Sequence, residues 1–340
     1  MDDYGYLAAR IRGMKGRLLP GDFFQGLLEQ KELMKVADSL LSSPYGEDMS
    51  VALAGESGLL AVEKALRRNL YRVFRKVFQM CSEEPRRLLR VLLGKWDVYN
   101  IKTVLRGKQR GLPAQEVLSA LVPAGELDEP KLQELLNQPD VKAVIDTLAT
   151  WLSPFAPPLL GAFPEYLEKG QLAPLEQALD RCYFNWVLSE TSLGGENNEG
   201  FVREIIKREI DYQNLLSALK IVSGRFEAVE VEFFPGGNLS GEYLSGAKSL
   251  EEVLTGLKKA YPDLDGRLAE GAESPSDAEH LFYCFLLRKW SDMVRKDPLS
   301  IAIVLGFLGL KLKEFLNLRI IVRSKAHGVP VDIIKKELVA

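Results

Sequence analysis

Residues 95–108 read KWDVYNIKTVLRGK, and this stretch decides the fold. An apolar pattern typical of a helix runs through it, yet Asp97 and Asn100 lie inside that pattern. Both residue types bond to nearby backbone groups in competition with the helix, so both lower its stability at an interior position. The reason for placing them there begins to emerge from two further copies of the same arrangement.

The motif is acidic-x-x-Asn-aliphatic-x-x-x-aliphatic-basic. It begins at Asp97 as DVYNIKTVLR, and it returns without a gap as DYQNLLSALK from Asp211 and as EFLNLRIIVR from Glu314. The asparagines are separated by 114 and 103 residues. The asparagines and the closing basic residues of the three copies are Asn100, Asn214 and Asn317, and Arg106, Lys220 and Arg323.

Two more landmarks accompany each copy. A glutamate opens an aromatic-rich helical segment 34 or 35 residues before the motif acid, at Glu63, Glu176 and Glu279. A Pro-Gly-type turn lies further upstream, at Pro20, Pro123 and Pro235. The shared order predicts an internal triplication, with boundaries at about 1–110, 111–226 and 227–340. We call these predicted units repeats 1, 2 and 3; they are far longer than solenoid repeats, so each is expected to be a helical bundle.

The composition favours a packed all-α protein. Hydrophobic residues make up 46% and charged residues 27% of the 340 residues, and the formal net charge is −3. Leu, Ala, Glu, Lys and Arg are all frequent, whereas alternating Val/Ile/Thr runs are nearly absent. The weak net charge gives no indication of nucleic-acid binding. We therefore predict three pseudo-equivalent helical bundles.

The motif residues are predicted to have a structural role. On a helix the apolar members form one stripe, the acidic residue falls inside it, and the Asn lies at its edge. A buried carboxylate needs a cation or a backbone N–H, because an unpaired buried charge is costly. The Asn can clamp a neighbouring loop through its donor and its acceptor. Candidate cations from the preceding landmark helix are Arg67, Arg68 and Arg181.

The helix ends carry signals of their own. Each motif helix is expected to end at a glycine in the left-handed conformation, Gly107, Gly224 or Gly328. Two helix starts are expected at Asp297-Pro298 and at Ser274-Pro275, where the first residue would be the N-cap.

The sequence contains no pattern typical of an enzyme. GxxxxGK[ST], GxSxG and HExxH do not occur, and the two histidines lack metal-ligand spacing. The cysteines Cys81, Cys182 and Cys284 lack CxxC spacing and are expected to be buried. No catalytic, cofactor-binding or metal-binding residue and no small-molecule substrate is predicted. No secretory signal is evident, and the longest apolar run, residues 298–310, is shorter than the roughly 20 residues that span a bilayer. A cytoplasmic protein is expected.

The three motif segments resemble the signature helices of the C subunit of bacterial and archaeal V-type (A-type) ATPases, whose eukaryotic vacuolar counterpart is the d subunit. They are KWDVYNIKTVLRGK, REIDYQNLLSALK and IVLGFLGLKLKEFLNLRIIVRSKAHG. The stretches YGYLAARIRGMKGRLL and FFPGGNLSGEYL are also similar to that family. The resemblance covers essentially the whole chain.

The resemblance implies a funnel-shaped, all-α, non-catalytic part of the rotor without cofactors, present as a single copy per complex. It would be peripheral, on the cytoplasmic face of the membrane proteolipid ring, and it would receive the central shaft of subunits D and F. Independently of the resemblance, three like units in head-to-tail contact can close into a ring. Such a collar would transmit torque through stiff packing, and a polar grip on the ring would be salt-sensitive.

Two other functions remain open. One is a cytoplasmic helical scaffold that binds a partner helix in a central groove and is unrelated to ion transport. The other is an all-α enzyme with a dispersed acidic site, an alternative that only the motif carboxylates support.

Overall fold

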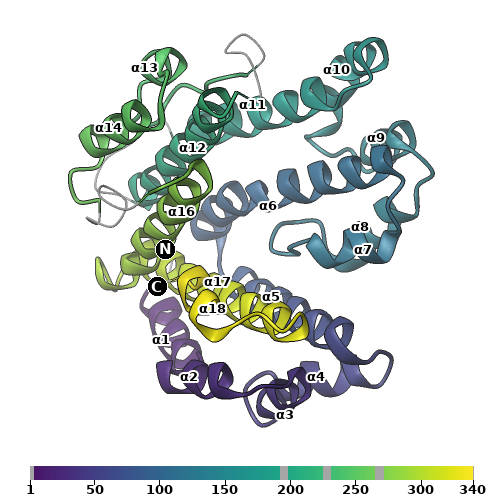
Figure 1. Ribbon diagram of the computed structural model, residues 1–340, viewed down its shortest axis with the longest axis vertical. Helices are drawn as coiled ribbons and strands as arrows, with labels where there is room; N and C mark the ends of the chain where they lie inside the picture. Colours follow the sequence, from purple (N-terminus) through teal and green to yellow (C-terminus); the bar gives the residue numbers. More distant parts are fainter. Residues whose placement is uncertain (1–3, 192–197, 225–230, 265–271, 340) are drawn as a thin grey trace. The chain divides into compact units, whose positions relative to one another are not determined.

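The structure is a computed structural model that describes residues 4–191, 198–224, 231–264 and 272–339 (Figure 1). These residues form α-helices and one short 3-10 helix, and none of them lies in a β-strand. The predicted all-α class is therefore confirmed. The chain divides into two compact units: unit 1 contains Met1–Tyr183 and Leu310–Leu338, and unit 2 contains Phe184–Gly309 and Val339–Ala340.

Unit 1 is built from two runs of short helices, each followed by longer ones. The first run leads to α5 and α6, and the second run leads to α11, whose last turns belong to unit 2. The helices are α1 (Tyr4–Lys15), α2 (Gly21–Glu29), α3 (Leu33–Leu41), α4 (Gly46–Leu53), α5 (Gly58–Met80), α6 (Glu83–Arg110), α7 (Ala114–Ala120), α8 (Glu129–Asn137), α9 (Val141–Thr150), α10 (Ala156–Lys169) and α11 (Ala173–Glu190).

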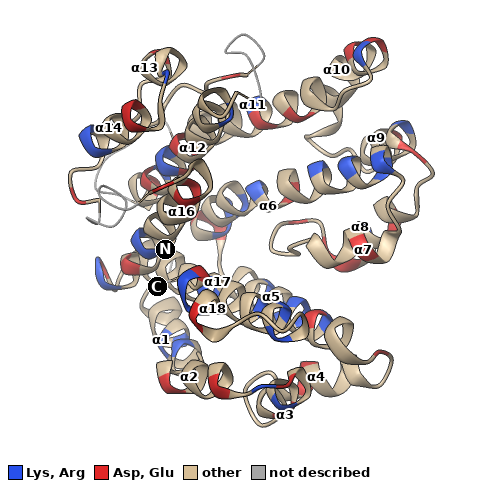
Figure 2. Ribbon diagram, in the orientation of Figure 1, with Lys and Arg blue, Asp and Glu red and all other residues tan. Residues whose placement is uncertain are grey.

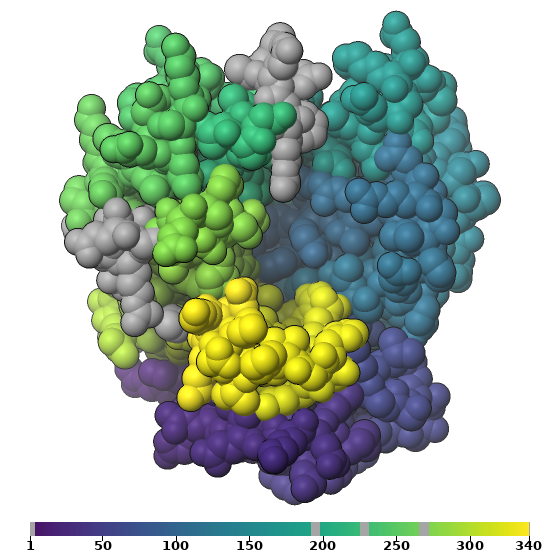
Figure 3. Space-filling view, in the orientation of Figure 1, coloured from purple at the N-terminus to yellow at the C-terminus, as the bar shows by residue number. Residues whose placement is uncertain are grey.

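The core of unit 1 follows from helical spacing. In α5 the buried residues recur every three or four positions, as in Leu66, Leu70, Phe74 and Val77, so one face of the helix is apolar. That face packs against α3 and α4, while α6 packs against α7, α8 and α9. The C-terminal half of α17 (Ile301–Ala326) and α18 (Val331–Glu337) also belong to unit 1. In Figure 3 these C-terminal residues, in yellow, lie against the N-terminal residues, in purple.

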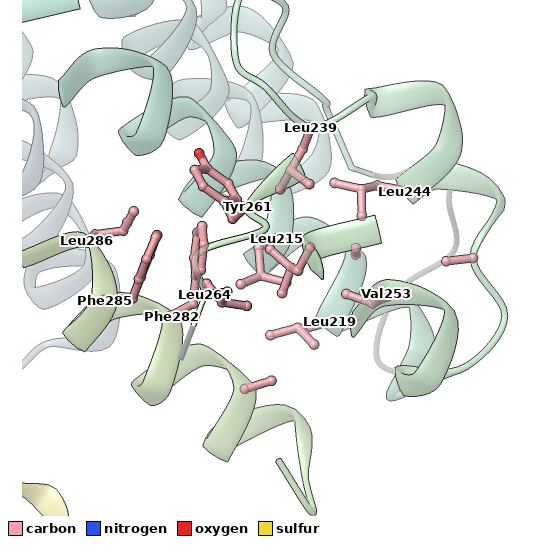
Figure 4. Packing of buried hydrophobic residues seen from close by; sticks show 14 residues of the cluster. Leu215, Leu219, Leu239, Leu244, Val253, Tyr261, Leu264, Phe282, Phe285 and Leu286 are labelled. Atoms are coloured by element: carbon pink, nitrogen blue, oxygen red, sulfur yellow. The ribbon is translucent and has the colours of Figure 1, made fainter. Parts of the chain in front are cut away.

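Unit 2 is organised around α12, which packs against the other long helix of this unit and against two short ones. Its helices are α12 (Asn198–Val222), α13 (Gly241–Gly246), α14 (Leu250–Ala260), α16 (Pro275–Asp292), the 3-10 helix η2 (Met293–Arg295) and the first turns of α17. Leu215 of α12, Val253 of α14 and Phe282 of α16 are fully buried in one cluster (Figure 4). Tyr261 lies edge-on to Phe282 in the same cluster, with ring centroids 5.4 Å apart.

Two glycines allow α17 to lie close to its neighbours in unit 2. A Cβ on Gly306 would be 2.0 Å from the backbone nitrogen of Val294, and a Cβ on Gly309 would be 2.9 Å from that of Ser291. Larger residues cannot occupy these positions without separating the helices. The apolar run of residues 298–310 therefore includes the part of α17 that packs closely on α16 and η2. No helix among the described residues is long and apolar enough to cross a membrane.

The predicted helix ends are correct in part. Gly224 and Gly328 have φ of 67° and 66°, as a left-handed cap requires. Gly107 is instead buried inside α6, where Val117 packs on it. A Cβ added to Gly107 would lie 2.5 Å from a methyl group of Val117. The helix continues to Arg110 and ends at Gly111, with φ of 63°.

Of the two predicted helix starts, one is correct and the other is wrong. Ser274 is the N-cap of α16 and accepts a hydrogen bond from the Asp277 N–H at 3.2 Å, as predicted. The prediction of an N-cap at Asp297 is wrong, because α17 begins at Ile301, whose N–H donates to Asn198 Oδ1 at 2.9 Å. Asp297 accepts from the Leu299 N–H in the preceding turn.

Cys81 is buried as expected, whereas Cys182 and Cys284 are partly exposed, contrary to the prediction. The division into repeats stays a prediction. The two compact units separate within α11 and α17 and do not follow the predicted boundary at 110/111, and the boundary at 226/227 lies outside the described residues. The arrangement of bundles around a central axis stays a prediction as well.

Candidate functional site

The first motif helix binds the loop between α7 and α8. Asp97 Oδ2 accepts a hydrogen bond from the Glu126 N–H at 2.9 Å, and its Oδ1 accepts from the Leu127 N–H at 2.8 Å. One turn along α6, the Asn100 amide pairs with Val122, donating to its carbonyl at 2.8 Å and accepting from its N–H at 2.9 Å. Two side chains thus satisfy four backbone groups of one loop, and we call this arrangement a clamp.

The second motif helix repeats the clamp in unit 2. Asp211 Oδ2 accepts from the Asn238 N–H at 2.9 Å, and Oδ1 accepts from the Leu239 N–H at 2.8 Å. Asn214 donates to the Phe234 carbonyl at 2.9 Å and accepts from its N–H at 2.7 Å. The two clamps therefore share the same donors, acceptors and order along the loop.

The third clamp joins the C-terminal half of α17 to the N-terminal part of the chain. Glu314 Oε2 accepts from the Leu19 N–H at 2.6 Å, and Oε1 accepts from the Tyr45 hydroxyl at 2.8 Å. Lys311 Nζ lies 2.5 Å from Glu314 Oε1 and 2.9 Å from the Tyr45 hydroxyl. Asn317, the third motif asparagine, is 9% exposed. This clamp holds an ion pair in place of a second backbone donor.

The clamped loops share a position relative to the next helix. The leucine that donates to each carboxylate directly precedes the N-cap residue of the following helix: Leu19 before Pro20, Leu127 before Asp128 and Leu239 before Ser240. The sequence comparison aligned Pro20 with Pro123 and Pro235. In repeat 1 the bound residue comes before that proline, whereas in the other repeats it follows, so the helix start is the equivalent point.

Two glycines make room for the carboxylates. A Cβ on Gly125 would lie 2.2 Å from Asp97 Oδ1, and a Cβ on Gly237 would lie 2.1 Å from Asp211 Oδ1. Each loop must therefore present bare backbone to its carboxylate, which explains a glycine directly before the two donating residues.

Burial dominates the electrostatics of the clamps. Burial raises the pKa of Asp97 from 3.8 to about 7, although the two backbone hydrogen bonds and Lys131 act in the opposite direction. Burial also raises the pKa of Asp211, against the hydrogen bonds from Tyr261, Leu239 and Asn238. The hydrogen bonds that Asp97 accepts from described residues come from the backbone.

The sequence predicted the kind of group that binds each carboxylate, a cation or a backbone N–H, but not the residue that supplies it. Backbone N–H groups, one of the two expected alternatives, bind Asp97 and Asp211. Arg68 lies 3.3 Å from Asp48 Oδ1. The cation of the third clamp is Lys311, which the sequence reasoning missed. Its position three residues before Glu314 on the same helix was the available signal. The tyrosine hydroxyls of Tyr45 and Tyr261 were also missed.

Two of the three basic motif residues bind landmark glutamates. Arg106 forms a two-pronged pair with Glu176, with both N–O distances 2.6 Å, and Arg323 pairs with Glu63. Lys220 is exposed. The landmark Glu279 accepts from the Tyr212 hydroxyl at 3.2 Å. The sequence comparison found both sets of residues without connecting them, because the partners lie in different predicted repeats.

These contacts connect the three predicted repeats in a cyclic order. The motif helix that ends repeat 1 binds a loop of repeat 2, and that of repeat 2 binds a loop of repeat 3. The motif helix of repeat 3 binds a loop of repeat 1. Among the described residues, no group of three His, Cys, Asp or Glu side chains could hold a metal ion. The motif carboxylates are buried and each accepts at least one hydrogen bond from the backbone of a loop, so the arrangement holds these loops in place.

The chain is similar to known proteins over nearly its whole length. A family model described as ATP synthase (C/AC39) subunit matches residues 7–337. The chain belongs to this family. Relatives include the C subunit of the A-type ATP synthase of Haloferax volcanii, 30% identical over 341 residues, which cover 98% of this chain and 97% of the relative. The C subunit of the V-type ATP synthase of Deinococcus radiodurans is 29% identical over 342 residues, covering 100% of this chain and 92% of the relative. The corresponding A-type protein of Methanococcoides burtonii is 28% identical, over 99% and 94% of the two chains.

Proposed function

We propose that this chain is the non-catalytic rotor socket of a V-type (A-type) ATPase, linking the central shaft to the membrane proteolipid ring. In this role one copy receives shaft subunits D and F and passes torque to the ring during ATP-coupled ion transport. Membership of the ATP synthase (C/AC39) subunit family supports the assignment to the complex. Relatives named as the C subunit of A-type and V-type ATP synthases match nearly the full length of the chain.

The single observation that best supports a mechanical role is the cyclic order of the clamps. A socket under torque must resist sliding of one helix pair past the next. Each motif helix is fixed to the following repeat through a buried carboxylate, and hydrogen bonds to charged groups contribute about 1.5–3 kcal/mol each. Because Glu314 binds Leu19, the series of links returns to the repeat in which it began. Load applied at one link is then shared by the others.

A non-catalytic role also agrees with the state of the acidic residues. General acid–base catalysis requires a carboxyl group within reach of a substrate proton. The side chains of Asp97, Asp211 and Glu314 are at most 5% exposed and point at loop backbone. We infer that they serve the packing of the socket, and that the chain is peripheral on the cytoplasmic face of the membrane.

Affinity purification of the tagged chain from solubilised membranes, followed by mass spectrometry, tests this proposal. We expect the proteolipid of the ring and the shaft subunits to accompany the chain, and an unrelated tagged helical protein to retrieve neither. Recovery of a single helical partner without ring or shaft would favour the scaffold alternative and would contradict the rotor proposal. Recovery of the chain without any of these proteins would contradict both.

A further inference from the structure

A pocket of about 220 Å³ lies in unit 1, between α5, α6, the start of α8 and the loop that precedes α8. Its α5 wall is aromatic and consists of Tyr71, Phe74 and Phe78. These residues share one face of α5, because they are three and four positions apart. Phe74 is buried, whereas Tyr71 and Phe78 are partly exposed, so the aromatic surface extends from the core toward solvent.

The first clamp fixes another wall of this pocket. Leu93 lines the pocket one turn before Asp97 on α6, and Asp97 accepts from the Glu126 N–H at 2.9 Å. Gly125 and Glu126 of the clamped loop line the pocket as well. Arg90 Nε lies 2.7 Å from Glu126 Oε1, which is a second link between α6 and the loop. The walls are therefore held in place by the fold itself, and a preformed pocket lowers the cost of binding.

Cations surround the aromatic surface. Figure 2 shows Lys and Arg recurring along α5 and α6, and Arg75 and Arg90 of these series line the pocket. Lys131 adds a further cation from α8, and all of these cationic side chains are exposed. Glu126 is already paired with Arg90. Within the described part of the chain, Arg75 and Lys131 form no ion pair.

Two further carboxylates lie near the pocket without lining it. Burial raises the pKa of Tyr71, Asp128 and Glu129 raise it further, and Arg75 opposes them. Asp128 and Glu129 stand at the start of α8, where their charges complement the positive end of the helix dipole. Asp128 also accepts from the Lys131 N–H at 3.1 Å as the N-cap of that helix. An occupant therefore meets aromatic, aliphatic and cationic groups and one carboxylate that is already paired.

The size of the pocket indicates the kind of occupant. Pockets for drug-sized ligands measure about 300–1,000 Å³, so this smaller one suits a single large side chain. Apolar side chains that fill such pockets contribute much of the affinity of protein interfaces. The cations without an internal partner favour an occupant that carries carboxylates beside this anchor.

We propose that this pocket binds one bulky apolar side chain from an acidic segment of another protein, whose carboxylates pair with Arg75 and Lys131. The anchor packs on the aromatic wall of α5, where offset or edge-on ring contacts add to the burial of apolar area. The carboxylates reach the two exposed cations at the rim. The inference goes beyond the rotor assignment and does not depend on it.

Titration of the purified full chain with blocked tripeptides, followed by ligand-observed NMR, tests the proposal. The probe is acetyl-Glu-Trp-Glu-amide. We expect acetyl-Glu-Ala-Glu-amide, which lacks the anchor, and acetyl-Lys-Trp-Lys-amide, which reverses the charges, to bind about tenfold more weakly or less. Absence of binding by the probe, or equal binding of either other peptide, would overturn the proposal. Indole-3-acetate bound as tightly as the probe would indicate a pocket for a free small molecule and would contradict a docking site.

Variants of the chain show whether the probe occupies this pocket. Phe78→Ala should weaken binding about tenfold and Arg75→Glu about fivefold. Lys76→Glu changes an exposed cation that is next to Arg75 but does not line the pocket, and it should leave the affinity unchanged. Equal affinities of Arg75→Glu and Lys76→Glu would contradict the proposal. If thermal unfolding shows that Arg75→Glu does not fold, Lys131→Glu takes its place with the same expected loss.

Discussion

Glu314 accepts a hydrogen bond from the backbone N–H of Leu19 at 2.6 Å, and 295 positions separate the two residues. The contact places the last copy of the motif on the first loop of the chain. The other copies bind loops only 30 and 28 positions further along, at Leu127 and Leu239. One motif therefore makes the same kind of link locally twice and at long range once. We propose that this order of links gives the chain its stiffness as a collar.

The third clamp predicts strong coupling between Lys311 and Glu314. Glu314→Gln should lower the free energy of unfolding by about 3–5 kcal/mol, because it leaves the 4% exposed Lys311 as an unpaired buried charge. The double variant Lys311→Met with Glu314→Gln should be more stable than Glu314→Gln. Denaturant unfolding of the two single variants and the double variant measures the coupling. Additive losses would contradict a buried ion pair at this clamp.

The first clamp predicts a pH dependence. Burial raises the pKa of Asp97 to about 7, above the value of about 4 for an unfolded chain. Between pH 4 and 7 the folded chain therefore binds a proton at Asp97 that the unfolded chain does not. This proton binding stabilises the folded state at low pH, and the stabilisation is lost as the pH rises through that range. The destabilisation caused by Asp97→Asn should be about 2 kcal/mol larger at pH 5 than at pH 8.

Thermal or denaturant unfolding at several pH values checks this difference. The exposed Asp38 of α3 provides the control, and Asp38→Asn should run parallel to the wild type. A constant difference between the wild type and Asp97→Asn over this range would contradict a raised pKa at the clamp.

The clamped loops predict an intolerance of side chains at two glycines. Gly125→Ala and Gly237→Ala should each lower stability by about 2 kcal/mol or more, because the new Cβ would overlap a buried carboxylate. Gly161→Ala, inside α10 with no atom within 4 Å of the new Cβ, should raise stability by about 0.5–1 kcal/mol. Midpoints of thermal unfolding compare the three, and equal effects would show that the loops yield easily.

The motif asparagines predict a loss from unsatisfied backbone. Asn214→Ala should cost about 2–4 kcal/mol, because the N–H and the carbonyl of Phe234 would both lose their buried partners. Asn137→Ala, at an exposed position at the end of α8, should change stability by less than about 0.5 kcal/mol. Similar small losses in the two variants, measured by denaturant unfolding, would mean that water replaces the clamp.

The proposed grip on the membrane ring predicts sensitivity to salt. A contact made by polar and charged side chains weakens as the Debye length falls from about 10 Å at 0.1 M to about 3 Å at 1 M. The chain should therefore leave membranes progressively over a salt series, as followed by immunoblotting. Retention independent of ionic strength would argue against a polar grip.

The sequence predicted the helical class and the residues of the motif, but not most of their partners. Helical periodicity identified a carboxylate within an apolar stripe at Asp97, because that pattern is local. It could not identify Lys311 as a cation or Tyr45 as a donor, since those contacts depend on how separate helices pack. Gly107 was mistaken for a helix end for the same reason: it is small because Val117 packs on it, and its sequence context does not reveal this.

The rotation of the chain itself is the most direct test of the rotor assignment. A probe attached to this protein in the intact complex, with the stationary part fixed to a surface, should turn in one direction when ATP is supplied. A probe that stays still while the complex hydrolyses ATP and turns a probe on the shaft would contradict the account.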